Sequence, residues 1–340
     1  MQTLEQLIEQ GMLVRGIKAK ANPETLAYTH FAVGVANKDY AAKTPLLWNT
    51  AYAAFGLAAR NIRFFGDPLN AKQIFDVLKD DPRYLGGDVG VGFKDKVWEL
   101  IDRIDPVAKE MRSVNVVVKD WDGLLTGHNT DGTGYAASLE EVLAERGEKL
   151  KSRTVIILGG GGTANSIAFA LAMRGARVAI LNRTVSKAEN LAARINAFLR
   201  TTFAYGGGRD ELARLAPGAL AIISVIDDPA SPLDRYSALG PIELPATPEH
   251  IEDNLSGARK IMASLNKSAI ISDVMLRDGE TTTVREAAAM GFKTLDGQPM
   301  VFNQAVLAFA LVNNRSLSHR GIGPAEIARA MRDGSLGGSQ

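Results

Sequence analysis

Lys94 and Asp131 are of the residue types that can move a proton during hydride transfer. Lys94 follows the short apolar stretch 89–93, and Asp131 lies in the polar segment Gly127–Gly134. When a hydride leaves an alcohol carbon, the hydroxyl proton must leave as well, and a lysine beside a carboxylate can accept it. An aspartate just before a helix can also be a simple N-cap, so the residues alone leave both interpretations open.

Asn115 is a third polar residue in an apolar setting, because it stands within the β-branched segment Val114–Val118. A side-chain amide inside a buried strand needs hydrogen-bond partners, and such a residue ordinarily belongs to a structural polar network. The residues alone therefore favour a structural role for Asn115.

A glycine-rich segment supplies the groups that a pyrophosphate needs. Glycines allow close backbone approach and expose N–H groups at a helix N-terminus, and this cluster stands between an apolar run and a helical stretch. A tight turn without a ligand is the alternative interpretation. The residues predicted to bind the pyrophosphate are Gly159, Gly161, Gly162, Thr163 and Ala164.

The end of the next predicted strand indicates which dinucleotide binds. NAD-preferring sites usually place a carboxylate about 20 residues past the glycines to hold the ribose hydroxyls. This chain has a guanidinium and short polar groups there, which fit a 2′-phosphate better. A solvated surface arginine is the alternative. The cofactor predicted is NADP, held here by Asn182, Arg183, Thr184 and Lys187.

An α/β scaffold is needed to position these side chains. Short β-branched runs alternate with longer helical stretches, which favours an α/β fold with parallel strands. Upstream of the glycines we expect a strand at 28–35, a helix at 45–57, a strand at 114–118 and a hairpin turn at 122–123. From the glycines onward we expect strands at 155–158, 178–181, 219–226 and 269–274, and helices at 163–174, 187–199 and 301–312. Residues 228–267 are too many for an ordinary connection, which indicates an insertion or a lid.

Composition narrows the function classes. The 340 residues carry 39 Lys and Arg against 38 Asp and Glu, so no strong field favours nucleic acid or an anionic membrane. Apolar runs are far shorter than the roughly 18 residues of a membrane span, and no secretory signal is visible. The histidines show no metal-ligand spacing, and cysteine is absent. We therefore predict a cytoplasmic protein of two domains that binds no metal.

Together these motifs resemble those of the shikimate dehydrogenase family. The resemblance covers most of the chain between about residues 33 and 311. It rests on the segments 91–94, 113–118, 127–132, 159–164, 182–184, 273–281, 285–287, 291–297 and 300–304. It implies an N-terminal α/β substrate domain, residues 1–131 with 297–340, and a Rossmann-type doubly wound NADP domain, residues 132–296. A C-terminal helix is expected to return to the first domain.

The resemblance also implies roles by position. Lys94 and Asp131 match the family's catalytic pair. Asn115 and Gln304 match its binders of ring hydroxyls, and Arg183 matches its 2′-phosphate clamp. The expected partner is a small molecule, either a cyclic hydroxy acid or a cyclitol, and we expect a monomer or homodimer without nucleic acid or membrane partners.

The chain departs from the family pattern where the family holds the substrate carboxylate. Of an S-x-S hydroxyl pair only one donor remains, at Thr44, because Ala42 takes the place of the other. Gly90 replaces a threonine, and Leu276 replaces a tyrosine. The reaction type survives these changes, whereas they bear directly on which substrate the pocket prefers.

Three functions follow from these observations. The leading hypothesis is reduction of 3-dehydroshikimate to shikimate with NADPH, as in aromatic amino acid biosynthesis. The second keeps the chemistry and changes the ring to quinate, an aminoshikimate or a cyclitol. The third is a non-catalytic NADP-binding regulator, against which the presence of both Lys94 and Asp131 argues, because a sensor needs no proton-transfer pair.

Overall fold

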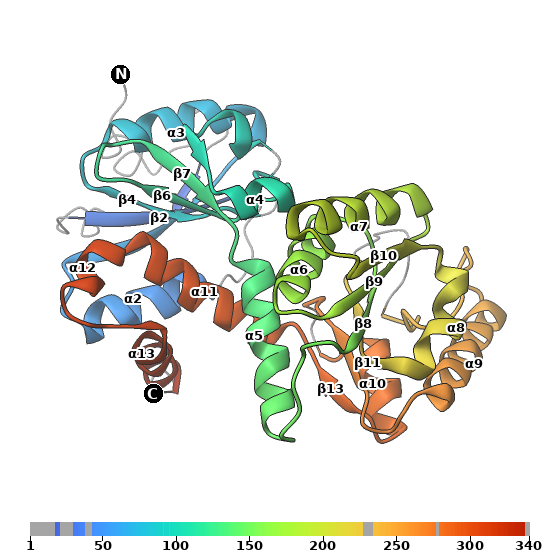
Figure 1. Ribbon diagram of the computed structural model, residues 1–340. Helices are drawn as coiled ribbons and strands as arrows, with labels where there is room; N and C mark the ends of the chain where they lie inside the picture. The colour runs from blue at the N-terminus through green and yellow to red at the C-terminus, as the bar shows by residue number, and fades with distance from the viewer. Residues whose placement is uncertain are drawn as a thin grey trace. The chain divides into compact units, whose positions relative to one another are not determined.

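The computed structural model describes residues 18–20, 30–37, 43–90, 92–94, 96–226, 234–276 and 279–336. Its internal contacts divide the chain into two compact units (Figure 1). Unit 1 comprises Met1–Thr130 and Asn303–Gln340, and unit 2 comprises Asp131–Phe302. The domain bounds at 131/132 and 296/297 stay a prediction. Ala42 and the start of the expected insertion, residues 228–233, lie outside the described residues.

Unit 1 is built on a mixed sheet whose described strands run in the order β1-β3-β2-β4-β6-β7-β5. The strands are β1 (Lys18–Lys20), β2 (His30–Ala36), β3 (Ala59–Phe65), β4 (Tyr84–Asp88), β5 (Arg103–Ile104), β6 (Val116–Lys119) and β7 (Leu125–His128). Its helices are α2 (Thr44–Ala54), α3 (Ala71–Asp80), α4 (Pro106–Met111), α12 (Asn314–Ser318), α13 (Pro324–Leu336) and, from Asn303 on, α11 (Gln298–Val312). Strand β2 pairs in parallel with β3 and β4, whereas β4, β6 and β7 pair antiparallel.

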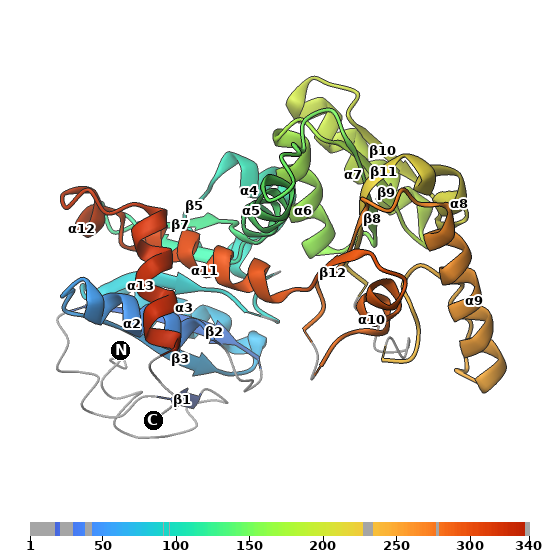
Figure 2. The ribbon, with the colours of Figure 1, turned by 90° about the horizontal axis from the view of Figure 1, so that it is seen from below.

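The two faces of the unit 1 sheet bury different sets of side chains. Because side chains alternate along a strand, Val33 and Val35 of β2 point with Ile62 of β3 into the core under α3. On the α2 side, the Trp48 indole donates to the carbonyl of Ala305 in α11 at 3.1 Å. Figures 1 and 2 both show α11 and α13 beside α2, so the expected return of the C-terminal helix to unit 1 is confirmed.

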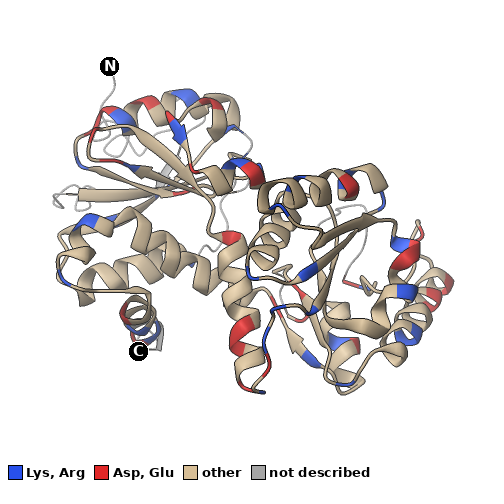
Figure 3. Cartoon of the chain, in the orientation of Figure 1, with Lys and Arg blue, Asp and Glu red and all other residues tan. Residues whose placement is uncertain are grey.

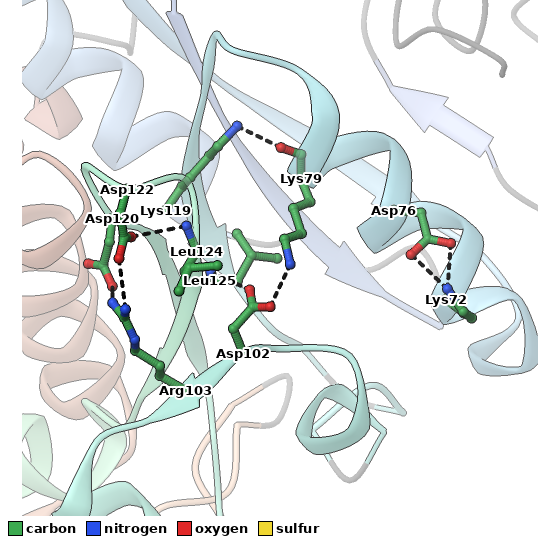
Figure 4. Close-up of polar contacts among 10 residues, drawn as sticks. All are labelled: Lys72, Asp76, Lys79, Asp102, Arg103, Lys119, Asp120, Asp122, Leu124 and Leu125. Atoms are coloured by element: carbon green, nitrogen blue, oxygen red, sulfur yellow. Dashed lines mark hydrogen bonds and ion pairs between the residues drawn. The ribbon is translucent and has the colours of Figure 1, made fainter.

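The hairpin expected at residues 122–123 joins β6 to β7, which pair antiparallel. Asp122 accepts a hydrogen bond from the Leu124 amide at 3.2 Å and pairs with Arg103 at 2.7 Å (Figure 4). Asp102 similarly accepts from the Leu125 amide at 2.8 Å. These contacts lie at the turn end of the hairpin, and the exposed Arg103–Asp122 ion pair shapes the turn more than it stabilises the unit.

Unit 2 is built on parallel strands in the order β10-β9-β8-β11-β12-β13. The strands are β8 (Thr154–Leu158), β9 (Arg177–Leu181), β10 (Ala204–Gly207), β11 (Ala219–Ser224), β12 (Ile270–Asp273) and β13 (Lys293–Leu295). The helices are α5 (Asp131–Ala144), α6 (Gly162–Met173), α7 (Val185–Leu199), α8 (Leu212–Leu215), α9 (Pro248–Ser264) and α10 (Thr282–Ala289). Numbered along this unit, the order is 3-2-1-4-5-6, which is that of a doubly wound dinucleotide fold.

Close helix packing in unit 2 requires glycine at one position of α5. A Cβ atom on Gly132 would lie 2.0 Å from the backbone oxygen of Ser166 in α6. Any side chain there would push α6 away from α5. The segment 127–134 therefore carries a packing requirement in addition to its predicted site residue, Asp131.

The sequence located the strands and helices around the glycine loop correctly, within one or two residues. The strand expected at 219–226 ends earlier, at Ser224, and the stretch 228–267 contains the helix α9. The strands β3, β4, β5, β10 and β13 were not predicted. In β4 and β10 the reason is a Gly-Gly pair, which has low strand propensity. Tertiary pairing imposes the strand conformation on these residues.

Charges of both signs are interspersed over each unit (Figure 3), as the balanced composition suggests. None of the described helices is long and apolar enough to cross a membrane.

Candidate cofactor and substrate sites

Unit 2 contains a cavity of about 620 Å³ at the carboxyl edge of its parallel sheet, a size that suits a small-molecule ligand. The edge is where ligands of open parallel sheets ordinarily bind. The described lining residues are Gly159, Gly160, Gly161, Gly162, Thr163, Leu181, Asn182, Arg183, Arg209, Val225, Ile226, Ile242 and Leu244. None of these carries a carboxylate, and two are arginines, so the described lining favours an anionic ligand.

The glycine loop between β8 and α6 leaves room for a ligand phosphate to contact the protein backbone. Gly159 has a φ of +130°, and a Cβ there would lie 2.8 Å from the Val225 side chain. A Cβ on Gly161, the residue before α6, would meet nothing within 4 Å. The open space at this helix N-terminus fits a pyrophosphate, because its amides and dipole attract negative charge.

The end of β9 presents polar groups to the same cavity. The Asn182 side chain donates to the Thr184 carbonyl at 3.0 Å, which fixes the turn into α7. The Asn182 backbone N–H also donates to the Gly207 carbonyl at 3.1 Å and so connects the ends of β9 and β10. Arg183 is exposed and lines the cavity, in the place where a 2′-phosphate is expected.

Six of the nine predicted cofactor residues line this cavity. They are Gly159, Gly161, Gly162, Thr163, Asn182 and Arg183. Ala164 is fully buried within α6, and Thr184 contributes its carbonyl to the turn before α7. Lys187 is exposed in the first turn of α7. The roles of all nine residues remain proposals.

Seven of the lining residues were not among those predicted. Four of them, Gly160, Leu181, Val225 and Ile226, adjoin the predicted glycine loop and strand ends, whereas Arg209, Ile242 and Leu244 come from other segments. Arg209 lies two residues past the end of the short strand β10, so it could have been found once that strand was placed, because the carboxyl ends of parallel strands share one edge. Ile242 and Leu244 belong to the segment interpreted as an insertion or lid, and its sequence gives no sign of where it folds.

On unit 1, three polar side chains from distant segments form one hydrogen-bonded cluster. The Asn115 amide nitrogen donates to the Thr130 hydroxyl at 3.0 Å and to the Gln304 side-chain oxygen at 3.3 Å. The Asn115 side-chain oxygen accepts from the Thr130 amide at 2.7 Å. Asn115 and Thr130 are buried, and Gln304 is half-buried. The structure thus joins the two predicted hydroxyl binders and adds Thr130, which was not predicted.

The remaining candidate site residues are Thr44 and Lys94 in unit 1 and Asp131 in unit 2. Thr44 is buried at the start of α2, and Lys94 is half-buried in the turn that follows β4. Lys94 belongs to unit 1, whereas Asp131 is the first residue of unit 2 and of α5, so their action as a pair remains a prediction. Among the described residues, no cluster of three or more His, Asp or Glu side chains could hold a metal ion.

A buried ion pair lies on the same unit as Lys94. Arg63 of β3 and Asp88 at the end of β4 pair at 2.9 Å, with side chains only 5% and 12% exposed. Burial raises the pKa of Asp88, and the positive charges of Arg63 and Lys94 oppose that shift. Asp88 therefore lies close enough to Lys94 to affect its electrostatic environment.

Comparison with known proteins decides the family. The chain is 32% identical over 271 residues to a shikimate dehydrogenase (NADP⁺) of Natronomonas pharaonis, which covers 79% of this chain and 87% of the relative. The chain belongs to the shikimate dehydrogenase family. Family models agree, since the shikimate/quinate 5-dehydrogenase model matches residues 141–204 and the shikimate dehydrogenase substrate binding domain matches residues 35–117.

Solved structures of this family and of a related reductase share the fold. A shikimate dehydrogenase in complex with NADP⁺ has a TM-score of 0.70 and 26% identity, covering 90% of this chain and 95% of that one. The 5-ketofructose reductase of Gluconobacter sp. strain CHM43 has a TM-score of 0.68 and 27% identity, covering 90% and 98%. The α/β fold, the NADP-dependent dehydrogenase activity and the cofactor NADP are thereby confirmed.

Proposed function

We propose that this member of the shikimate dehydrogenase family reduces 3-dehydroshikimate to shikimate with NADPH. The observation that carries the proposal is the hydrogen-bonded cluster of Asn115, Thr130 and Gln304, whose first and last members are 189 residues apart in sequence. Polar side chains held in this way can recognise ring hydroxyls. The name of the Natronomonas pharaonis relative supports shikimate as the product.

Residues of both units contribute to the proposed reaction. When bound, NADPH supplies a hydride from its nicotinamide ring. The glycine loop and Arg183 of unit 2 hold the phosphates. Lys94 and Asp131 hold and deliver the proton that the ring oxygen gains when its carbonyl becomes an alcohol. Thr44 retains one hydroxyl donor for a substrate carboxylate.

A substrate panel followed by NADPH absorbance tests the proposal. We expect oxidation of shikimate with NADP⁺, and reduction of 3-dehydroshikimate with NADPH, to exceed turnover of every other compound in the panel. The panel includes quinate, an aminoshikimate, several cyclitols and a neutral keto-sugar. Turnover of none of these, with NADP⁺ still bound, would instead favour a non-catalytic regulator.

A second candidate is reduction of a neutral ring or sugar ketone. At the sequence positions where the family pattern has carboxylate-binding hydroxyls, Gly90 and Leu276 provide none, and Ala42 provides none either. The likeness to 5-ketofructose reductase favours the same candidate, because the name of that protein specifies a keto-sugar substrate. A neutral ketone as the best substrate in the panel would select it over shikimate.

We further propose that the protein acts in the cytoplasm as a monomer or homodimer, with a small molecule as its partner and neither nucleic acid nor membrane. Light scattering after size-exclusion chromatography distinguishes the two assembly states. A larger assembly would contradict this part of the proposal.

A further inference from the structure

Arg209 lies at the edge of the cofactor cavity, although no motif points to it. It is the first residue of the short 3₁₀ helix Arg209–Glu211, which Gly208 links to the end of β10, and it lines the cavity together with Arg183. Strand β10 pairs in parallel with β9, and the Asn182 backbone N–H donates a hydrogen bond to the Gly207 carbonyl at 3.1 Å. The carboxyl ends of these two strands therefore bring both arginines to the same side of the cavity.

The Arg209 guanidinium is half-buried and has no carboxylate partner among the described residues. It donates to the carbonyls of Ala238 at 2.7 Å and Gly240 at 3.1 Å, and burial lowers its pKa. The nearby Glu211 carboxylate accepts from Tyr205 at 2.6 Å and pairs with Arg214 instead. A cation partly removed from water without a counter-charge is unfavourable, and a bound anion would supply the missing charge.

The segment that Arg209 contacts also forms one wall of the cavity. We name residues 234–247 the strap. It is anchored by Asn254 of α9, which exchanges hydrogen bonds with Ser237 at 2.8 and 3.0 Å. The Tyr236 hydroxyl donates to the Glu243 carbonyl at 2.6 Å. The strap residues Ile242 and Leu244 line the cavity with apolar side chains.

We propose that Arg209 is a second cation for the 2′-phosphate of NADP, acting with Arg183 at the ends of β10 and β9. This inference rests on NADP being the cofactor of the proposed function. Ile242 and Leu244 provide an apolar surface for the adenine base, and Arg209 joins that surface to the phosphate end by its contacts with the strap. The strap is thus a wall of the proposed nucleotide site.

Calorimetric titration without substrate tests this role independently of turnover. The probes are NADP⁺, NAD⁺ and adenosine 2′,5′-bisphosphate, and the variants are Arg209→Met and Arg209→Gln. The glutamine amide can still donate to the strap carbonyls, so Arg209→Gln removes the charge while sparing the anchor. We expect NADP⁺ and the bisphosphate to bind about 10- to 100-fold more weakly, as for a lost hydrogen bond to a charged group, and NAD⁺ within threefold of the unmodified protein. Arg209→Lys should retain most of the affinity.

The matched control is Tyr236→Phe, which removes a strap hydrogen bond and no charge. We expect it to change NADP⁺ and NAD⁺ binding by the same factor. If Arg209→Gln also weakens both nucleotides equally, or neither, Arg209 has only a structural role and the assignment is wrong. If the unmodified protein binds neither dinucleotide, the proposed cofactor itself fails, which is a different result from a loss confined to the variants.

Discussion

The Arg63 guanidinium reaches the Asp88 carboxylate at 2.9 Å by passing over Gly34, the β2 residue that separates their strands. A Cβ on Gly34 would lie 2.6 Å from an Asp88 carboxylate oxygen and 3.0 Å from the guanidinium. The missing side chain of Gly34 is therefore what lets β3 and β4 exchange an ion pair across the strand between them.

Removing one partner of this pair should destabilise unit 1. Arg63→Met removes the hydrogen-bonded partner of a buried carboxylate and leaves only the charge of Lys94 acting on it, so we expect a loss of about 3–5 kcal/mol in the free energy of unfolding. The three tryptophans, Trp48, Trp98 and Trp121, all belong to unit 1, so their fluorescence in urea reports this unit. Arg60→Met, at an exposed position of the same strand, should change the value by under about 0.5 kcal/mol. Equal effects of the two variants would contradict a stabilising pair.

Alkaline pH should unfold unit 1 through its buried tyrosines. Burial raises the pKa of Tyr52 and of Tyr84 above the ordinary tyrosine value. With the folded-state pKa above the unfolded one, the stability contributed is complete below pH of about 10 and falls as the pH rises further. The expected slope is about 1.4 kcal/mol per pH unit for each tyrosine. Tyr84→Phe should remove one such contribution between pH 10 and 11.5, and an unchanged slope in that variant would rule Tyr84 out as a cause.

Lys94 and Asp131 should be needed for turnover and dispensable for nucleotide binding. We expect Lys94→Met and Asp131→Asn each to lower kcat by about 100-fold or more, the usual scale of acid–base catalysis. Because the two are proposed to act as a unit, the double variant should be little worse than either single one. Stopped-flow or steady-state NADPH absorbance gives kcat, and calorimetry with NADP⁺ gives the control. Near-normal kcat in Lys94→Met would refute the assignment.

Arg183 should set the preference for NADP over NAD. We expect the unmodified protein to bind NADP⁺ at least about tenfold more tightly than NAD⁺, a difference of about 1.4 kcal/mol. Arg183→Ala should remove most of that difference and leave NAD⁺ binding nearly unchanged, because the pyrophosphate contacts remain. Dissociation constants measured by calorimetry decide the matter, and equal values for both nucleotides in the unmodified protein would contradict the prediction.

Restoring hydroxyls at the carboxylate end should improve shikimate binding. A hydrogen bond to a charged group contributes about 1.5–3 kcal/mol, so the unmodified chain should have a KM for shikimate well above the micromolar range. Ala42→Ser with Leu276→Tyr should lower that KM, with kcat changed less. The same double variant should leave the KM of a neutral ketone unchanged. Tight, efficient turnover of shikimate by the unmodified protein would show that other groups hold the carboxylate.

The parts of the protein that sequence could predict are those specified by neighbours in the chain. The segment from β8 through the glycine loop and α6 to β9 is continuous in sequence. The conformation of its glycines and the hydrogen bond from the Asn182 side chain to the Thr184 carbonyl depend on neighbouring backbone. Arg209 depends on carbonyls of the strap about 30 residues later, and Arg63 depends on Asp88 across an intervening strand. Thr130 joins Asn115 and Gln304 only once the register of β6 and β7 is fixed. Such pairings require strand order, which local patterns do not contain.

The hydrogen bond between Trp48 and Ala305 also bears on how the chain folds as it leaves the ribosome. At about 5–20 residues per second, the 257 residues that separate them take on the order of 10–50 s to synthesise. Unit 2 is one unbroken stretch and can fold within that interval. Unit 1 stays incomplete until α11 emerges, with the apolar side of α2 uncovered. We therefore expect the apolar side of α2 to be exposed in the nascent protein for that interval.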